Sequence, residues 1–227
     1  MATSEVTVTG DDLALNTDHI VGAPGTVTYT SSDPSVATVD ADGVVTAVGL
    51  GESTVTAQVS IGGEEVRSNP VRVSVVTPPN PPTGQVWASD LPFVTETNGW
   101  GPVERDRSNG EADAGDGRVL TLGSTAYAKG LGVHASSEVG LYLGGQCSRL
   151  TAAVGLDAEV GTGGSVVFEV RADGRVVWTS PRLTGGAPAT PVDVDLAGAT
   201  TVQLRVTDGG DGNSYDHADW ADARLTC

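Results

Sequence analysis

The sequence predicts an all-β protein built from two β-sandwich domains. Short runs rich in valine and threonine alternate with Gly, Asp and Pro turn signals every eight to twelve residues or so. No run of useful length shows the 3.6-residue apolar period of a helix. Residues 78–82 contain four prolines, and a cluster of this kind favours an extended spacer that divides the chain in two.

The first predicted domain covers residues 1–76. Its runs are short, β-branched and often alternating, and turn signals such as Asp33-Pro34 and Asp42-Gly43 separate them. Short strands joined in this way are typical of a sandwich of two packed sheets. The strands are expected at residues 6–9, 26–29, 36–39, 44–47, 53–59 and 71–75.

A proline-rich linker is expected at residues 77–84, and a second domain at 85–227. The second domain also reads as β, with a hairpin turn at Asp173-Gly174 and a half-exposed alternating strand at 192–196. Long polar loops between the strands favour a jelly-roll sandwich. Strands are expected at 130–133, 149–154, 165–171, 175–178, 192–196 and 201–206, with a terminal strand after Trp220.

The charge balance excludes two classes of partner. Twelve basic against 29 acidic residues give a net charge of −17, which opposes binding to nucleic acid and to anionic membrane surfaces. No apolar run reaches 18 residues, so no membrane insertion is expected. No secretion signal precedes the first strand pattern, and we expect a targeting segment to lie outside this sequence.

Two cysteines, Cys147 and Cys227, leave two interpretations open. They are either buried free thiols or one disulfide formed in an oxidising compartment. A bridge would close a loop of about 80 residues and stabilise the fold by roughly 4–5 kcal/mol in the chain-entropy model. Neither cysteine belongs to a C-x-x-C pair, which argues against a zinc or redox site.

The unusual residues gather in three loops of the second domain. Nine of the ten aromatic residues follow residue 86, and sugars are recognised by aromatic faces together with polar groups. The third loop holds five aspartates within residues 208–222, a density that needs solvation, pairing or a metal ion. The three loops are residues 98–108, 129–135 and 207–222.

Residues 29–51 carry a specific resemblance for the first domain. The runs YTSSDPSVATVD and GVVTAVGLG resemble the bacterial Ig-like domain of group 2, over nearly all of residues 4–76. The resemblance implies an Ig-like β-sandwich that serves as a spacer. With Tyr29 as its one aromatic residue, this domain offers no stacking platform for a ligand.

The second domain resembles the NPCBM domain, also called carbohydrate-binding module family 51. The matching runs are WASDL at 87–91, NGWGPVERDRS at 98–108, KGLGVHA at 129–135 and DGGDGNSYDHADWADA at 208–223. The resemblance implies a galactose-binding-like jelly-roll β-sandwich with a structural calcium ion. It further implies binding of terminal galactose or blood-group-type glycans and attachment to a secreted glycoside hydrolase.

Six residues form the sugar site that the resemblance implies. Trp100 would stack on the sugar, with core packing as its alternative. Glu104 would accept from two hydroxyl groups, or instead pair with Arg105 or Arg107. The complete set is Trp100, Glu104, His134, Asn213, Tyr215 and His217.

The remaining four residues of this set have alternatives too. His134 follows an apolar strand and could be a core histidine. Asn213 offers a donor and an acceptor to an axial hydroxyl group, or sits in a turn. Tyr215 would contact the sugar or shield its loop. His217 would contact the sugar or pair with Asp216 or Asp219, and Trp220 is expected in the core.

Calcium is expected at Asp106 and Asp222, by analogy with related sandwiches that combine an early loop with an acidic residue near the last strand. Hard carboxylate oxygens suit this ion. Asp113 and Asp116 compete for the same role, because they lie in a glycine-rich acidic insert. The spacing in the third loop is not that of an EF-hand.

A non-catalytic binding function is therefore expected. A glycosidase needs two carboxyl groups held about 5–10 Å apart in a cleft, and small sandwiches leave little room for one. We predict an extracellular monomer that holds a glycan for an attached catalytic domain. The alternative is a structural or adhesion module of a surface protein without sugar binding, which would expose a broad apolar patch instead.

Overall fold

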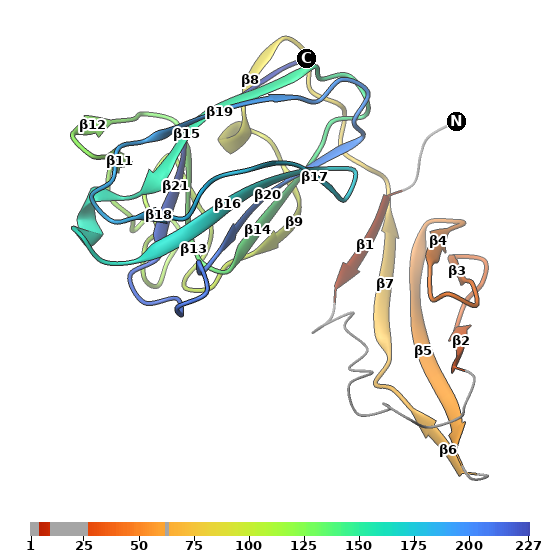
Figure 1. Cartoon of the computed structure of the whole chain (residues 1–227). Coiled ribbons are helices and arrows are strands. Elements are labelled where there is room, and N and C mark those ends of the chain that lie inside the picture. Colours follow the sequence, from red (N-terminus) through yellow and green to blue (C-terminus); the bar gives the residue numbers. More distant parts are fainter. Residues whose placement is uncertain (1–4, 10–26, 62–63) are drawn as a thin grey trace. The chain divides into compact units, whose positions relative to one another are not determined.

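The computed structural model describes residues 5–9, 27–61 and 64–227 of the chain (Figure 1). It divides into two compact units, Met1–Pro78 and Pro79–Cys227. Both are all-β, as predicted, and the division falls inside the predicted linker. No helix of the described part is long and apolar enough to cross a membrane.

The first unit contains an antiparallel sheet in the order β1-β7-β5-β2, with β6 beside β5, and a separate β3-β4 pair. Alternation turns Val55, Val73 and Val75 inward against Val36 and Ala37. The expected Ig-like sandwich is confirmed; β6, rich in charged residues, had not been predicted. The strands are β1 (Glu5–Thr9), β2 (Val27–Ser31), β3 (Ala37–Val39), β4 (Val45–Ala47), β5 (Gly51–Ile61), β6 (Glu64–Arg67) and β7 (Val71–Val76).

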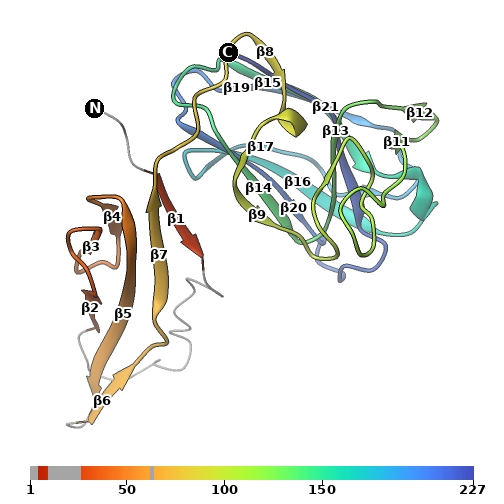
Figure 2. The same cartoon turned by 180° about the vertical axis from the view of Figure 1, so that it is seen from behind.

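The second unit packs two six-stranded sheets face to face (Figures 1 and 2). One sheet has the order β10-β13-β21-β15-β19, with β8 beside β21. Its strands are β8 (Gln85–Trp87), β10 (Glu104–Arg105), β13 (Gly130–His134), β15 (Arg149–Leu156), β19 (Thr190–Asp195) and β21 (His217–Thr226).

The opposing sheet has the order β17-β16-β20-β14-β9, with β18 beside β16. A hairpin, β11 (Thr121–Leu122) with β12 (Thr125–Ala126), and two 3₁₀ helices, η2 (Ala88–Asp90) and η3 (Ala158–Val160), complete the unit. The strands of the opposing sheet are β9 (Phe93–Thr97), β14 (Ser137–Tyr142), β16 (Ser165–Ala172), β17 (Arg175–Thr179), β18 (Leu183–Thr184) and β20 (Thr201–Thr207).

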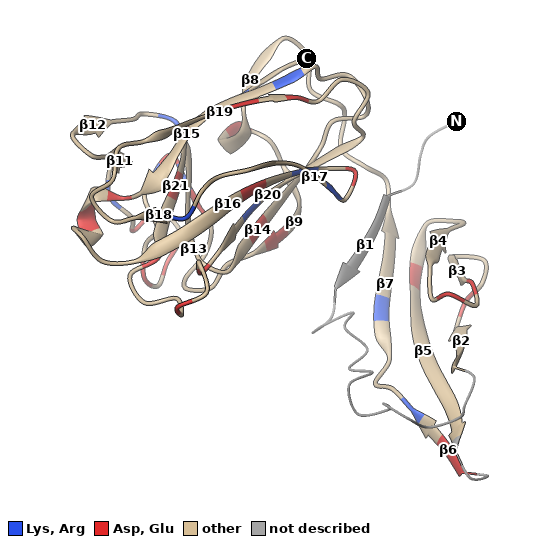
Figure 3. Cartoon of the chain, viewed as in Figure 1, with Lys and Arg blue, Asp and Glu red and all other residues tan. Residues whose placement is uncertain are grey.

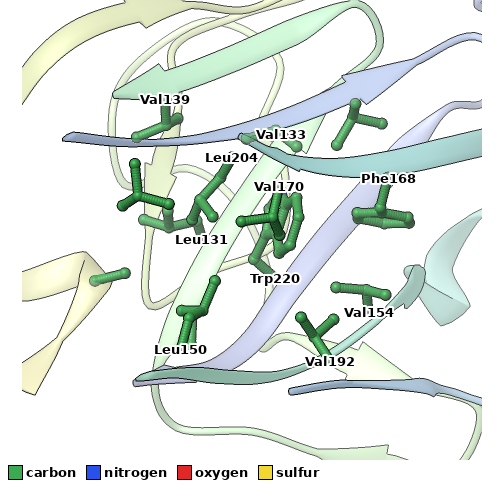
Figure 4. Close-up of a cluster of buried hydrophobic side chains, with 14 of the residues drawn as sticks. Leu131, Val133, Val139, Leu150, Val154, Phe168, Val170, Val192, Leu204 and Trp220 are labelled. Atoms are coloured by element: carbon green, nitrogen blue, oxygen red, sulfur yellow. The ribbon is translucent and has the colours of Figure 1, made fainter. Parts of the chain in front are cut away.

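The core of the second unit lies between these sheets (Figure 4). Trp220 is fully buried there, as predicted, and its ring meets that of Phe168 edge to face with centroids 5.1 Å apart. Alternating residues of both sheets surround this pair. Among them are Leu131, Val133, Val139, Leu150, Val154, Val170, Val192 and Leu204.

The two ends of this unit are tied together. A disulfide joins Cys147 to Cys227, so of the two interpretations the structure adopts the bridge. Gly84 and Cys227 exchange backbone hydrogen bonds of 3.2 and 2.7 Å, and Pro82 is buried. The last residues of the predicted linker therefore pack with the second unit. Acidic residues are spread over both units (Figure 3).

Candidate functional site

The candidate site is built on the outer face of the sheet that contains β13 and β21. Glycines leave room for the segment 107–122 to lie directly on part of this face. A Cβ atom at Gly132 would stand 2.3 Å from the Arg107 carbonyl oxygen, and one at Gly155 would stand 3.2 Å from Leu122. The glycines are therefore required by this close approach.

Beyond the covered part, two histidines face each other across the strands. His134 of β13 is directly opposite His217 of β21. Their ring centroids are 5.3 Å apart in an edge-to-face arrangement. Cross-strand neighbours on one face of a sheet lie this close by construction, so the pairing of β13 with β21 brings together residues 83 positions apart, that is 217 − 134.

Hydrogen bonds fix both rings. His134 Nδ1 is 2.9 Å from the Ala135 carbonyl oxygen, which can only accept, so Nδ1 carries the proton. His217 Nδ1 is 2.8 Å from Glu159 Oε1. Burial lowers the pKa of His134, and the nearby His217 lowers it further, against the opposing effect of the Ala135 hydrogen bond. His217 was expected to contact the sugar, with pairing to Asp216 or Asp219 as the alternative, and its hydrogen-bond partner in the structure is Glu159.

The Trp100 loop is held beside the histidines by Asn98, which sequence reasoning missed. The Asn98 amide donates to the carbonyl oxygens of Trp100 (2.8 Å) and Pro102 (3.0 Å). Its own oxygen accepts the His134 N–H at 2.7 Å. The Trp100 side chain, no part of the core, is 57% exposed. The Asn98-Gly99 dipeptide was the available signal for such a turn.

The third loop contributes Tyr215. Its side chain is 67% exposed, and its backbone has a φ of 67°, a conformation that is uncommon outside glycine. Cβ atoms placed on Gly163 and Gly164 would lie 3.1 Å and 2.3 Å from Tyr215 atoms. The Asp216 carbonyl oxygen accepts the Ala135 N–H at 3.3 Å, which joins this loop to β13. Asn213 is exposed.

Glu104 departs from the role that the resemblance implies. Its side chain is buried, 2% exposed. Each carboxylate oxygen lies 2.8 Å from the Gly115 N–H, and neither Arg105 nor Arg107 pairs with it. Glu104 therefore anchors the segment 110–117 from beneath, and as placed here it does not offer its oxygens to a ligand.

Two further carboxyl groups lie buried near the histidines. Asp219, fully buried, lies beside Asp157, whose oxygens already accept the N–H groups of Thr121 and Glu159. Burial, followed by the Asp157 charge, raises the pKa of Asp219 well above its usual range. Burial likewise raises the pKa of Asp216 to about 6. Burial therefore disfavours the charged form of Asp219 next to the histidine pair.

Of the two residues predicted to bind calcium, Asp106 pairs with a lysine, and Asp222 meets that lysine only through its backbone. Lys129 Nζ lies 2.5 Å from Asp90 Oδ1 and 2.7 Å from Asp106 Oδ2. The Gly130 N–H also donates to Asp106, and the Asp222 N–H donates to the Lys129 carbonyl oxygen. An ammonium group and an N–H donor at the same carboxylate do not fit a metal ligand, because a cation would meet like charge there.

The competing aspartates are organised by turns. Asp116 accepts the N–H groups of Glu111, Ala112 and Asp113 at 3.0–3.2 Å. Those hydrogen bonds, from Asp113 first, lower the pKa of Asp116. Within the described ranges, no three His, Cys, Asp or Glu side chains are grouped so as to hold a metal ion.

The structure thus brings together part of the predicted set. Trp100, His134, His217 and the Tyr215 loop meet at one end of the β13–β21 face through the contacts above. The other three lie away from this end. Glu104 holds the segment 110–117, and Asp106 and Asp222 contact Lys129. The structure adds two residues to the predicted set. Asn98 accepts the His134 N–H, and Glu159 holds the His217 ring.

Two family models match the chain. The NPCBM/NEW2 domain matches residues 84–226, and the bacterial Ig-like domain of group 2 matches residues 4–69. Both matches agree with the two resemblances drawn from the sequence runs, and the first covers the whole of the candidate site.

Solved structures show the same fold. The CBM51 module of Clostridium perfringens GH95 in complex with methyl-galactose is 34% identical, with a TM-score of 0.57, over 63% of this chain and 99% of that one. The CBM51-2 and INT domains of Clostridium perfringens ZmpB, with CBM51-2 in complex with GlcNAc, are 25% identical, with a TM-score of 0.58, over 88% of this chain and 40% of that one.

A curated relative gives the wider context. A protein of Renibacterium salmoninarum, provisionally named an endo-alpha-N-acetylgalactosaminidase, is 45% identical over 162 residues, or 71% of this chain. The chain spans 11% of the length of that relative.

Proposed function

The chain belongs to the NPCBM/NEW2 domain family, and on this premise we propose that residues 85–227 bind terminal galactose or blood-group-type glycans without catalysing a reaction. The relatives support the class of ligand, since the GH95 module was solved with methyl-galactose. Binding would hold a linked glycoside hydrolase at its substrate and so raise the local substrate concentration.

The observation that carries this proposal is the exposed Trp100 side chain on a loop that Asn98 ties to the backbone of His134, one of the two paired histidines. A sugar presents an apolar C–H face and a rim of hydroxyl groups, so it needs one aromatic surface and a few polar atoms. Trp100 is 57% exposed, and Asn98 ties its loop to the His134 backbone. We expect monosaccharide affinities of about 10–1000 μM, which correspond to roughly −4 to −7 kcal/mol.

The carboxyl groups near this end favour binding over hydrolysis. Hydrolysis of a glycoside needs a general acid and a second carboxylate about 5–10 Å away, both open to the sugar. Glu159 is hydrogen-bonded to His217, and Glu104 accepts a hydrogen bond from the Gly115 N–H. Asp219 is fully buried. None of these three is placed to work on opposite sides of a glycosidic bond.

Calcium binding by this chain stays a prediction. The Lys129 ammonium group beside Asp106 does not fit the predicted ligand pair, so sugar binding is not routed through a metal here. Calorimetry with Ca²⁺ on protein freed of metal by EDTA tests the prediction. Heat of binding that survives Asp106→Asn and Asp222→Asn would place the ion elsewhere in the chain.

The first unit fits the role of a spacer. We propose that the Ig-like domain and the prolines at 78–82 set the reach between the sugar-binding unit and the rest of an extracellular enzyme. The excess of acidic residues (Figure 3) is compatible with neutral glycans, which need no basic groups.

The experiment that tests the proposed function is a glycan-array screen of the chain and two variants. Trp100→Ala should lower galactoside affinity by at least about tenfold, the loss of one aromatic contact, and leave the unfolding temperature unchanged because the side chain is exposed. Val177→Ala, exposed on β17, is the matched control. Folded protein that binds no glycan would favour the structural or adhesion alternative.

A further inference from the structure

The His217 ring is held from behind by the short helix η3. Glu159 in η3 approaches His217 Nδ1 to 2.8 Å, and the two side chains are 13% and 20% exposed. Asp157 accepts the Glu159 N–H at 2.8 Å and donates its own N–H to the His217 carbonyl oxygen at 2.9 Å. The helix and the strand that carries the histidine are therefore locked to each other.

The second nitrogen of each ring is left for a ligand. No hydrogen bond within the described chain uses Nε2 of His134 or of His217. Neither atom is among the buried polar atoms that lack a partner, so both meet solvent. With each Nδ1 turned to a protein oxygen, Nε2 is the free nitrogen of each ring, and both rings lie at the end of the β13–β21 face that carries the Trp100 loop.

The chemistry of these nitrogens limits what they can bind. His134 holds its proton on Nδ1, because the Ala135 carbonyl oxygen can only accept it. In the neutral ring, Nε2 is then an acceptor. His217 has the same orientation, with its Nδ1–H directed at a carboxylate. Two neighbouring acceptors suit a ligand that offers two hydrogen-bond donors, such as two hydroxyl groups of a sugar.

We propose that Glu159 is a positioning residue of the sugar site, which it serves by fixing His217 so that both Nε2 atoms accept hydroxyl groups of one neutral sugar. This inference rests on the proposed function, and it adds a positioning residue and the exclusion of acidic sugars. The carboxylate of a sugar acid would face the lone pairs of the two Nε2 atoms and would lie near the Glu159 carboxylate. The two negative charges would repel each other.

The charged groups around His217 are consistent with this role. Glu159 faces it from η3, Arg118 lies 3.6 Å from the other Glu159 oxygen, and His134 faces it from β13. Asp216 precedes it in the chain, with Asp219 buried two residues further along β21.

Burial would raise the pKa of Glu159, but the hydrogen bonds from His217 and Ser108 lower it overall. Glu159 therefore remains a charged acceptor.

The first arm of the test needs no ligand. The chain has three histidines, so proton–nitrogen NMR correlations resolve each imidazole ring of the full chain. At pH 8 we expect the Nδ1–H tautomer for His134 and His217. Glu159→Ala should release His217 to the mixed tautomers of free imidazole and leave His134 unchanged. His217 in the Nε2–H form, or unaffected by Glu159→Ala, would overturn the proposal.

The second arm measures affinity for methyl galactoside and for galacturonic acid by calorimetry. Glu159→Ala should weaken methyl galactoside binding about tenfold, and Glu159→Gln, which keeps a hydrogen-bonding oxygen, about threefold or less. Glu169→Ala is the control, since Glu169 is also a half-buried carboxylate with arginine partners. Galacturonic acid should bind at least about tenfold more weakly than methyl galactoside.

The outcomes separate the two proposals. Wild-type protein that binds neither sugar would overturn the proposed function. Wild-type protein that binds while Glu159→Ala binds equally well would overturn the positioning role alone. Equal affinity for the two sugars would overturn the neutral-ligand class.

Discussion

At the scale of single residues, the candidate site depends on which atom of each polar group is already used. His134 and His217 each direct Nδ1 to a protein oxygen, and Asn98 uses its whole amide to shape the Trp100 loop. A sequence names these residue types but not the atoms that remain free. The free atoms decide whether a group can meet a ligand, as the buried Glu104 shows.

The charge state of His134 predicts how binding depends on pH. Its pKa is lowered from 6.5, chiefly by burial, so the ring is neutral above that pH and keeps its acceptor. Protonation of His134 should therefore not weaken galactoside binding between pH 8 and 6.5 and should weaken it only at lower pH, a profile that His217→Ala should retain. Calorimetry across this range checks it. Affinity that rises as the pH falls would show that the charged ring binds.

Asp216 predicts a pH dependence of stability. Its pKa is raised to about 6 from 3.8, so the folded state holds a proton that the unfolded state releases, and stability falls as the pH rises between these values. Asp216→Asn keeps the acceptor for the Ser165 N–H and carries no charge. It should be more stable than wild type by on the order of 2 kcal/mol at pH 8.

Urea unfolding at pH 4 and pH 8 measures this effect. The advantage of Asp216→Asn should shrink toward zero at pH 4, where the wild-type carboxyl group is neutral in the folded state. Asp222→Asn, at an exposed position of β21, is the control for removing one negative charge. An equal gain at both pH values would rule out titration of Asp216 as the cause.

At the scale of elements, glycine and valine patterns set where strands and loops pack. The hairpin β16–β17 was predicted from Asp173-Gly174, and both residues adopt positive φ, 47° and 76°. Strand β19 alternates as expected, with Val192 and Val194 buried. In contrast, β9 and β14 were missed, because their polar or glycine positions weaken the alternation that identifies a strand.

The segment 110–117 predicts a structural role for Glu104. Glu104→Ala leaves the Gly115 N–H without its acceptor and opens space beneath the segment. We expect a loss of about 2 kcal/mol in the free energy of unfolding. Faster amide exchange at residues 110–117 and a galactoside affinity that changes less than twofold should accompany it. A large loss of affinity with unchanged exchange would instead restore Glu104 as a ligand contact.

At the scale of the whole molecule, the sugar-binding unit is a closed structure. Its first and last strands, β8 and β21, are neighbours in one sheet, and the disulfide and the Gly84–Cys227 hydrogen bonds fix the end of the chain. The core between the two sheets is contiguous (Figure 4). This frame holds the loops beside His134 and His217, at the other end of β21 from the disulfide, in a fixed geometry.

The disulfide predicts a large contribution to stability. Cys147 and Cys227 are separated by 80 positions, so a double Cys→Ser variant should lose about 4 kcal/mol of unfolding free energy. Thermal unfolding of the variant, and of wild type in reducing agent, measures the loss. Galactoside affinity at a temperature where the variant is folded should be unchanged, because the bridge lies away from the histidine pair.

The sequence by itself determined the all-β class, the break at the prolines, the family of each part and the three loops. Local patterns and long motifs carry that information, because strand alternation and turn chemistry are properties of neighbouring residues. Only the tertiary structure paired His134 with His217, placed Glu159 behind them, set Lys129 between Asp90 and Asp106, and buried Glu104. These contacts join residues from 11 to 83 positions apart. The pairing of β13 with β21 decides the histidine pair, and the packing of loops on the sheet decides the others, neither of which can be read from neighbouring residues.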